Sequence, residues 1–337
     1  MVWTGAQHGK PMRYMLQPVL QTLAAGLAAT ATNHSRLEWG VGKRPTDVQE
    51  GTRHLSRGDI FIWVGRYGLA RGQGYDYSPR SSLSALLQGL TRRGVHTVFY
   101  NADPGDGCWT HRLPVSELWD YSWSTAAEST PPECLRRLPI RHVPPGFVRR
   151  RPRANLTSSS RQLLFMGVTD ASHAQRRFCL EQLNHQLQAL SLSVVSDNSV
   201  WTDDAFAATL RVYGLFLNVH KLCNVSTPPN ADCETFRFAQ VLSAGGLVIS
   251  ERCPEARDEE EWRGLVEFSP LDKIPQFAHR LVEGGPVHMH NLAAGRLARF
   301  ASRFDPVAIF ERASLPQLFA MLSSRRRGIV RCSTCSE

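Results

Sequence analysis

The stretch LLFMGVTDASHAQRRFCLEQL, residues 163–183, decides the fold predicted for the second half of the chain. It begins with an apolar run that ends at a glycine turn, as a strand buried on both faces does. The rest predicts an amphipathic helix, because Leu180, Leu183, Leu187 and Leu190 recur on one helical face. A strand, a glycine-containing loop and a helix in this order begin a β-α-β unit.

The same alternation of short apolar runs and helical patterns extends over most of the chain. The expected strands are GDIFIWVG (58–65), VHTVFYNADP (95–104), ELWDYSW (117–123), LPIRHVPPGF (138–147), SLSVVSD (191–197), LFLNVH (215–220) and LVIS (247–250). Helices are expected over Leu83 to Leu90, over 204–214 after a Thr202/Asp203 N-cap, over 235–245, and from 255. Helical patterns fill the remainder to about Ser324. Alternating strands and helices predict an α/β protein with parallel sheets.

A basic, serine-rich stretch, RRRPRANLTSSSRQ, separates the two halves without apolar periodicity. It predicts an N-terminal Rossmann-like domain over 1–148, a linker over 149–160, a C-terminal domain over 161–324 and a basic tail over 325–337. We expect the two domains to face one another across a cleft. Ligands in such sheets bind beyond the carboxyl ends of the strands.

Composition limits the classes of protein that fit. The 337 residues carry a formal net charge of +9, which favours a phosphorylated or polyanionic partner. No apolar run reaches the ~18 residues of a membrane span, and no secretory signal is visible at the N-terminus. Eight cysteines are too sparse for a disulfide framework, which predicts a reducing, cytoplasmic location. The sequons at Asn33, Asn155 and Asn224 would matter only in a secretory lumen.

Metal and nucleic-acid sites have little support in the sequence. Cys332 and Cys335 form a C-x-x-C without a second close pair, so no metal site is expected. The arginine runs at 149–151 and 325–327 lack interleaved aromatic residues, so a nucleic-acid partner is not expected.

The loop after the strand at 163–168 predicts a diphosphate site. The strand ends at Gly167, and Arg176 and Arg177 lie near the start of the following helix. Exposed backbone N–H groups and the helix dipole favour an anion there, and guanidinium groups strengthen the attraction. The alternative is a glycine turn into a surface helix whose arginines are solvated.

The segment NADCETFRFAQVLSAGGLVISE, residues 230–251, predicts a second part of the same site. Glu234 is placed in the first turn of a helix, with Arg237 one turn further on. A carboxylate there could accept hydrogen bonds from two ribose hydroxyls, and Arg237 could bind phosphate or orient the carboxylate. The alternative is a surface ion pair.

The order of these segments resembles the nucleotide-sugar half of GT-B glycosyltransferases, closest to the group-1-type and spore-maturation-type members. The resemblance covers roughly residues 58–270 and rests on the Gly167 loop, the arginine-bearing helix, LFLNVH, and E-x-x-R followed by LSAGGLVISE. It departs from the family at Gln240, where the family helix carries a glutamate. No D-x-D triplet is present, which agrees with the independence of a bound metal that is usual in this fold.

The resemblance implies that an inverting enzyme would take its catalytic base from the N-terminal domain. Candidates are His8, Asp103 and His111, because an imidazole or carboxylate near a strand end can accept the proton of an acceptor hydroxyl. A retaining enzyme would need no such base. In this topology His220, at the end of LFLNVH, would lie near the leaving diphosphate.

These observations predict a glycosyltransferase that moves a sugar from a nucleotide-diphosphate sugar to a glycan, lipid or protein acceptor, without a cofactor or a metal. Its nucleotide-sugar site would comprise Gly167, Arg176, Arg177, His220, Glu234 and Arg237, and its catalytic candidates would be His8 and Asp103. The alternatives are a catalytically inactive protein of the same fold that binds a nucleotide or glycan, and an RNA-associated protein suggested by charge alone.

Overall fold

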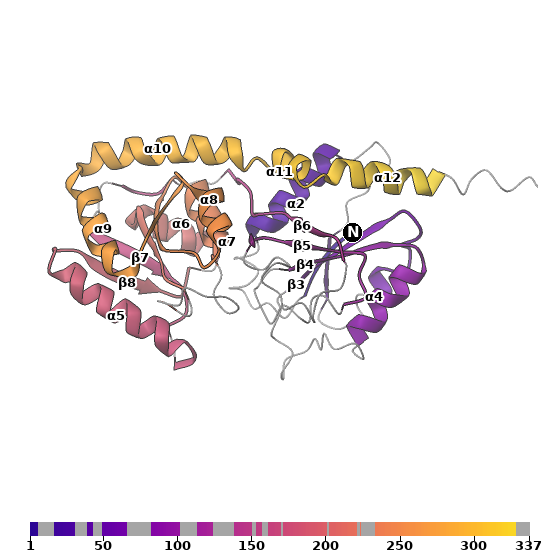
Figure 1. Ribbon diagram of the computed structural model, residues 1–337, viewed down its shortest axis with the longest axis horizontal. Helices are drawn as coiled ribbons and strands as arrows, with labels where there is room; N and C mark the ends of the chain where they lie inside the picture. The colour runs from indigo at the N-terminus through magenta and orange to yellow at the C-terminus, as the bar shows by residue number, and fades with distance from the viewer. Residues whose placement is uncertain are drawn as a thin grey trace, which may run out of the picture. The chain divides into compact units, whose positions relative to one another are not determined.

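A computed structural model of the chain describes residues 1–5, 17–30, 39–42, 49–65, 82–101, 113–123, 138–149, 153–156, 161–169, 171–200, 202–220, 223 and 233–327. Chain contacts divide it into two compact units, each built around its own parallel sheet (Figure 1). Unit 1 comprises Met1–Gly9, Leu23–Pro144 and Pro306–Glu337, and unit 2 comprises Lys10–Thr22 and Pro145–Asp305.

The sheet of unit 1 has six parallel strands in the order β2-β1-β3-β4-β5-β6. Their bounds are β1 (Val2–Gly5), β2 (Trp39–Gly42), β3 (Ile60–Gly65), β4 (His96–Asn101), β5 (Glu117–Asp120) and β6 (Ile140–His142). The helices that contribute to this unit are α2 (Gln17–Thr30, which also contributes to unit 2), α4 (Ser82–Arg92), α11 (Pro306–Arg312) and α12 (Leu315–Arg327). The sequence predicted β3 to β6 and α4, whereas β1 and β2 were not expected.

The sheet of unit 2 has five parallel strands in the order β11-β10-β9-β7-β8. Their bounds are β7 (Gln162–Met166), β8 (Ser193–Asp197), β9 (Leu215–Asn218), β10 (Leu247–Glu251) and β11 (Val266–Ser269). The helices are η5 (Ala171–His173), α5 (Ala174–Gln188), α6 (Asp203–Val212), α7 (Thr235–Ser243), α8 (Ala256–Trp262), η6 (Leu271–Lys273), α9 (Ile274–Glu283) and α10 (Gly285–Arg303). Two Rossmann-like parallel sheets confirm the predicted α/β fold class.

Helices cover both faces of the unit 2 sheet. Leu163, Phe165, Leu215, Leu217 and Ile249 form one apolar core with α5, α9 and the first half of α10. The alternate strand residues face the other way. On that side, Gly246 allows α7 to pack close, since a Cβ at this position would lie 2.6 Å from Val241 and 3.0 Å from Phe216.

Two local predictions for this unit can be compared with the structure. The predicted N-cap of α6 is confirmed, because the Thr202 side chain accepts a hydrogen bond of 3.1 Å from the backbone N–H of Ala205. The helical pattern predicted after residue 255 is wrong over Val266–Ser269, which forms edge strand β11 instead. The alternating sequence VEFS is short enough to be missed between two helices.

The boundaries of the units differ from those inferred from composition. Pro306–Ser324, assigned to the second domain from the sequence, groups with unit 1 by its contacts. Residues 153–156 of the predicted linker pack on unit 2. There Ala154 N–H donates to the carbonyl of Ala244 at 2.9 Å, and Asn155 N–H donates to that of Leu210 at 2.7 Å. These backbone hydrogen bonds make the segment part of unit 2.

The expectation about the cysteines is wrong for four of the eight. Cys179 is bonded to Cys223, and Cys233 is bonded to Cys253. All four side chains are buried. Among the residues that the structure describes, no helix is both long and apolar enough to cross a membrane.

Candidate functional site

The topology of the unit 2 sheet marks where a ligand would bind. Strand β7 lies between β8 and β9, and the chain passes from β7 to β8 on one side before it returns to β9 on the other. The winding therefore reverses between β7 and β9. In open parallel sheets, the carboxyl ends of the strands at such a reversal form the ligand crevice. A ligand site is therefore expected among the residues that follow β7 and β9 and at the first turns of helices α5 and α7.

Two arginines and one glutamate meet there. Arg176, in the first turn of α5, donates from Nη2 to Oε1 of Glu234 at 2.8 Å. Arg237, in the first turn of α7, donates from Nη1 to Oε2 of the same carboxylate. Glu234 itself is the N-cap residue of α7. The three side chains form one ion cluster, which we call the Arg–Glu–Arg cluster.

The cluster rests on residues at the ends of β7 and β9. Arg237 Nη1 also donates to Oδ1 of Asn218, the last residue of β9, at 3.0 Å. Both guanidinium carbons lie 5.5 Å from the ring centroid of the fully buried Phe165, a distance at which a cation is attracted to an aromatic face. A Cβ at Gly167 would lie 3.0 Å from Arg237 Nη2. The Gly167 turn therefore lies directly against the cluster, and glycine is the residue that allows this approach.

The cluster is buried and contains two cationic side chains and one anionic side chain. Arg176 and Arg237 are 3% and 6% exposed, and the side chain of Glu234 is 14% exposed. Burial opposes ionisation of Glu234, but the charges of Arg176 and Arg237, with His220, outweigh it and lower the pKa of the carboxyl group. Two guanidiniums and one carboxylate leave a net charge of +1. A buried charge of this kind favours an anionic ligand.

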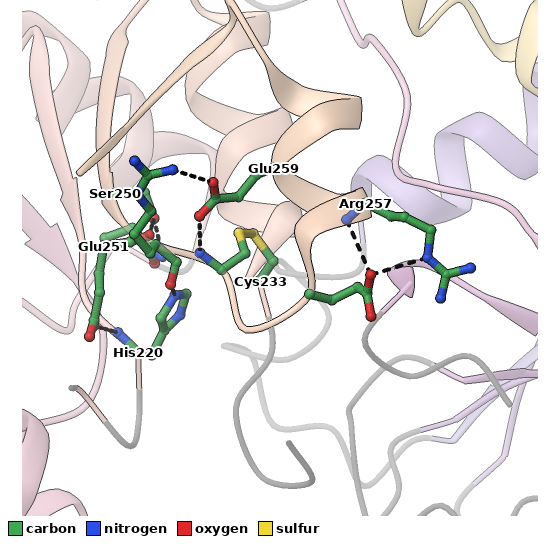
Figure 2. The surroundings of a disulfide bond; sticks show 10 residues. His220, Cys233, Ser250, Glu251, Arg257 and Glu259 are labelled. Carbon is green, nitrogen blue, oxygen red and sulfur yellow. Dashed lines mark hydrogen bonds and ion pairs between the residues drawn. A yellow bond between two sulfur atoms is a disulfide. The ribbon is translucent and has the colours of Figure 1, made fainter. Parts of the chain in front are cut away.

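His220 lies beside the cluster and is held by the segment after β10. Its backbone N–H donates to Oε2 of Glu251 at 3.2 Å, and its Nε2 lies 2.9 Å from the carbonyl oxygen of Arg252 (Figure 2). Nε2 must then carry the ring proton in the neutral form, which leaves Nδ1 as an acceptor. Nδ1 is buried and has no hydrogen-bond partner among the residues that the structure describes.

The two neighbouring arginines of α5 have different environments. Arg176 shares the buried face of the helix with Cys179, Leu180 and Leu183, whereas the Arg177 side chain is 53% exposed. Arg177 lies 3.8 Å from Glu181 in a surface ion pair. Of the two predicted phosphate ligands, the structure therefore brings only Arg176 into the cluster.

The sequence-predicted site residues fall into two groups. Gly167, Arg176, His220, Glu234 and Arg237 converge at the carboxyl ends of β7 and β9. The catalytic candidates His8, Asp103 and His111 lie outside the described residues.

Sequence reasoning missed Phe165, Asn218 and Glu251. The one signal for Asn218 is that it is a polar residue at the end of the apolar run LFLNVH. Across the described part of the chain, no group of histidine, cysteine, aspartate or glutamate side chains has the arrangement of a metal site.

The corresponding edge of the unit 1 sheet also carries polar residues. Asn101, Asp120 and His142 end β4, β5 and β6 and are paired in register across the three strands. The His142 ring stacks on Trp123, with ring centroids 4.2 Å apart. An amide, a carboxylate and an imidazole therefore line the carboxyl edge of this sheet.

Comparisons with known proteins identify structures of the same fold. No protein-family model matches the chain, and no curated protein is similar to it in sequence. The structure resembles that of HepE from Anabaena in complex with UDP-glucose, with a TM-score of 0.52 and 12% sequence identity over 96% of this chain and 99% of that one. It also resembles a mutant of TarM from S. aureus in complex with fondaparinux, alpha-GlcNAc-glycerol and UDP, with a TM-score of 0.53 and 7% identity over 82% of this chain.

The chain spans 58% of the length of the TarM chain, so TarM contains a large part without a counterpart here. At these identities the likeness concerns the fold alone. The chain has the α/β architecture of the GT-B glycosyltransferases, with two Rossmann-like parallel sheets, as its sequence resemblance predicted.

Proposed function

We propose that the protein transfers a sugar from a nucleotide-diphosphate sugar to a hydroxyl-bearing acceptor. The observation that carries the proposal is the Arg–Glu–Arg cluster, buried with a net positive charge at the winding reversal of the unit 2 sheet. HepE and TarM, which share the fold, were solved with UDP-glucose and with UDP, so UDP is the first nucleotide to test.

Arg176 and Arg237 supply the electrostatic part of the proposed reaction. When the bond between the sugar and the diphosphate breaks, negative charge grows on the leaving diphosphate. Guanidinium groups fixed beforehand by Glu234, Asn218 and Phe165 stabilise that charge without reorganising. The N-terminus of α5 adds backbone N–H groups, because its N-cap residue makes no side-chain capping bond.

Glu234 has two roles in the proposal. Both of its oxygens hold guanidiniums, which fixes the positions of Arg176 and Arg237. Each carboxylate oxygen has a further lone pair that can accept a hydrogen bond from a ribose hydroxyl. His220 Nδ1, a buried acceptor beside the cluster, is available to a hydroxyl or a protonated phosphate oxygen.

Closure of the two domains over the donor would bring the acceptor into line, as the resemblance to GT-B enzymes implies. In an inverting reaction the proton of the acceptor hydroxyl would pass to a base of unit 1. His8 and Asp103 remain the sequence-based candidates, and among the described residues Asp120 and His142 lie at the carboxyl edge of the unit 1 sheet.

Calorimetric titration of UDP, GDP and ADP, followed by assays of nucleotide release from their sugar conjugates, tests this function. Wild-type protein is expected to bind one of the three nucleotides and to release it from the corresponding donor. Arg176→Ala is expected to weaken nucleotide binding by about tenfold or more, since it removes a charge-assisted contact. Arg177→Ala is the matched control and is expected to bind as wild type does, because Arg177 lies on the exposed face of α5.

A nucleotide-binding protein without catalytic activity is the second candidate, because buried Gln240 stands where the resembled family has a glutamate. The same assay separates the two functions. Tight nucleotide binding with no turnover of any donor, across a broad acceptor panel, would favour the inactive protein. Absence of binding to all three nucleotides would refute both.

A further inference from the structure

The two disulfides join the segments that build the candidate site. Cys179 lies on α5, one turn after Arg176, and Cys223 lies three residues after His220. Cys233 immediately precedes Glu234, and Cys253 immediately follows Arg252 at the end of β10. Each cross-link therefore connects segments that follow different strands of the unit 2 sheet.

Cys223 is fully buried in the apolar core that α5 shares with the sheet, and a hydrogen bond also joins it to this helix. The side-chain Nε2 of Gln175 donates to the carbonyl of Cys223 at 2.8 Å. The disulfide to Cys179 is a covalent cross-link between α5 and the segment that follows β9. The bond keeps the end of the β9 segment against the helix that carries Arg176.

The second disulfide is held on its Cys253 side by Glu259 of α8. Oε1 of Glu259 accepts from the backbone N–H of Cys253 at 2.9 Å, and Oε2 accepts from Arg252 Nη1 at 2.7 Å (Figure 2). The carbonyl of Arg252 in turn positions His220. Glu234 is thus tied through its neighbour Cys233 to the segment that orients His220.

We propose that these two disulfides assemble the anion site, and that their reduction weakens binding of the nucleotide diphosphate. The inference rests on the proposed function and adds the redox regulation of its site. It assigns the protein to an oxidising compartment, because structural disulfides persist there and are reduced in the cytosol. This assignment differs from the cytoplasmic location expected from the sequence.

The two bonds differ in their access to a reductant. Cys253 is 8% exposed and lines a cavity of about 510 Å³ together with Glu251 and Arg252, whereas Cys179 and Cys223 of the other bond are 4% and 0% exposed. A dithiol entering this cavity would attack the Cys253 sulfur as a thiolate, form a mixed disulfide with it and release the Cys233 thiolate. The second thiol of the reductant then displaces Cys253, so the protein gains two thiols and the reductant becomes a cyclic disulfide. The bond between Cys233 and Cys253 is expected to open first.

The cross-links are tested by mass spectrometry of non-reduced digests, which does not depend on ligand binding. Peptides joined through Cys179 and Cys223, and through Cys233 and Cys253, are expected from protein purified under oxidising conditions. Free thiols at these four positions in protein that binds UDP would overturn the proposal.

The effect on the site is tested by titrating UDP against the oxidised protein and against samples reduced stepwise with dithiothreitol. Far-UV circular dichroism of each sample reports whether the sheets persist. Affinity is expected to fall by about tenfold or more, the equivalent of one lost charge-assisted contact, in parallel with opening of the Cys233–Cys253 bond. Equal affinity before and after that bond opens would overturn the proposal.

A double variant tests the Cys233–Cys253 bond without a reductant. Cys233→Ser/Cys253→Ser is expected to weaken UDP binding under oxidising conditions, and Cys332→Ser/Cys335→Ser is the control expected to leave it unchanged. If the Cys233→Ser/Cys253→Ser variant does not fold, stepwise reduction of wild-type protein tests whether this bond supports UDP binding. Failure of oxidised wild-type protein to bind UDP, GDP or ADP would instead refute the proposed function, and the digest would then show separately whether the bonds exist.

Discussion

Replacing Glu234 with glutamine tests the electrostatics of the Arg–Glu–Arg cluster. The substitution keeps the shape of the side chain but removes the negative charge that contacts both buried guanidiniums. Removing one partner of a buried ion pair costs about 3–5 kcal/mol. Because the Glu234 side chain is 14% exposed and partly hydrated, we expect a loss near the lower end, about 3 kcal/mol. For a domain of this size that corresponds to a decrease in Tm of roughly 6–12 °C.

The same variant is expected to bind inorganic pyrophosphate more tightly, because the net charge of the cluster rises from +1 to +2. A ligand present at 100 times its Kd stabilises a protein by about 2.7 kcal/mol, which would offset most of the predicted loss. If Glu234 served only to bind ribose, the variant would instead lose affinity for UDP, with its affinity for pyrophosphate and its stability unchanged.

Thermal unfolding followed by circular dichroism, with and without pyrophosphate, measures both effects. Glu181→Gln is the matched control, since it breaks the exposed pair with Arg177 and is expected to cost no more than about 0.5 kcal/mol. A destabilisation of Glu234→Gln no larger than that of the control, or no recovery with pyrophosphate, would refute the reasoning.

Three further predictions follow from the contacts of Arg176, Gly167 and the buried glutamates. Arg176→Ala is expected to bind pyrophosphate at least about tenfold more weakly, while Arg177→Ala binds it as wild type does. Equal effects of the two substitutions in calorimetry would contradict the assignment of Arg176 alone as a phosphate-binding residue. Gly167→Ala places a Cβ 2.7 Å from the Phe165 ring, so we expect the free energy of unfolding in urea to fall by about 1–3 kcal/mol. An unchanged urea midpoint would contradict the close approach of this turn to the ring. In unit 1, Glu117 of β5 is buried, which opposes its ionisation, but the neighbouring His96, a hydrogen bond from Trp119 and the charge of Arg141 outweigh this and lower its pKa. The pKa of Glu234 is lowered as well. The stability that the two carboxylates contribute is therefore complete above the pKa of an unfolded glutamate, about 4.3. It is lost as the pH falls through their lower pKa values in the folded protein. Tm should vary little with the ionisation of these groups from pH 7 to pH 5 and decrease below, and a Tm that rises on acidification would contradict this sign.

Much of the fold could be predicted because its central strands are short apolar runs. LFLNVH and LVIS lie in the middle of a sheet covered on both faces, so almost every position is buried and the run is visible in the sequence. Strand β11 is at the edge of the same sheet and has two half-buried residues, which makes its pattern weaker. Edge position and partial burial weaken the pattern of β11, whereas the half-buried edge strands β6 and β8 were still predicted.

The site could be predicted in part, since Glu234 and Arg237 lie on one helix turn. Their convergence with Arg176 depends on the sheet order, which brings β7 beside β9, and no local pattern contains that information. Arg176 and Arg177 could not be distinguished in the sequence, because the rotation of α5 decides which of them is buried.

The disulfides could not be predicted from cysteine spacing. The bonded residues are 44 and 20 positions apart, and they meet only because the loops after different strands share one edge of the sheet. The number of cysteines relative to chain length was therefore a poor guide to the chemistry of these four.

A crystal structure of the oxidised protein with UDP would test the central claim most directly. The account predicts the diphosphate at the carboxyl ends of β7 and β9, with its oxygens within hydrogen-bond distance of Arg176 and Arg237 and beside the Gly167 turn. A bound nucleotide whose phosphates lie elsewhere, with the cluster unchanged and out of reach, would contradict it.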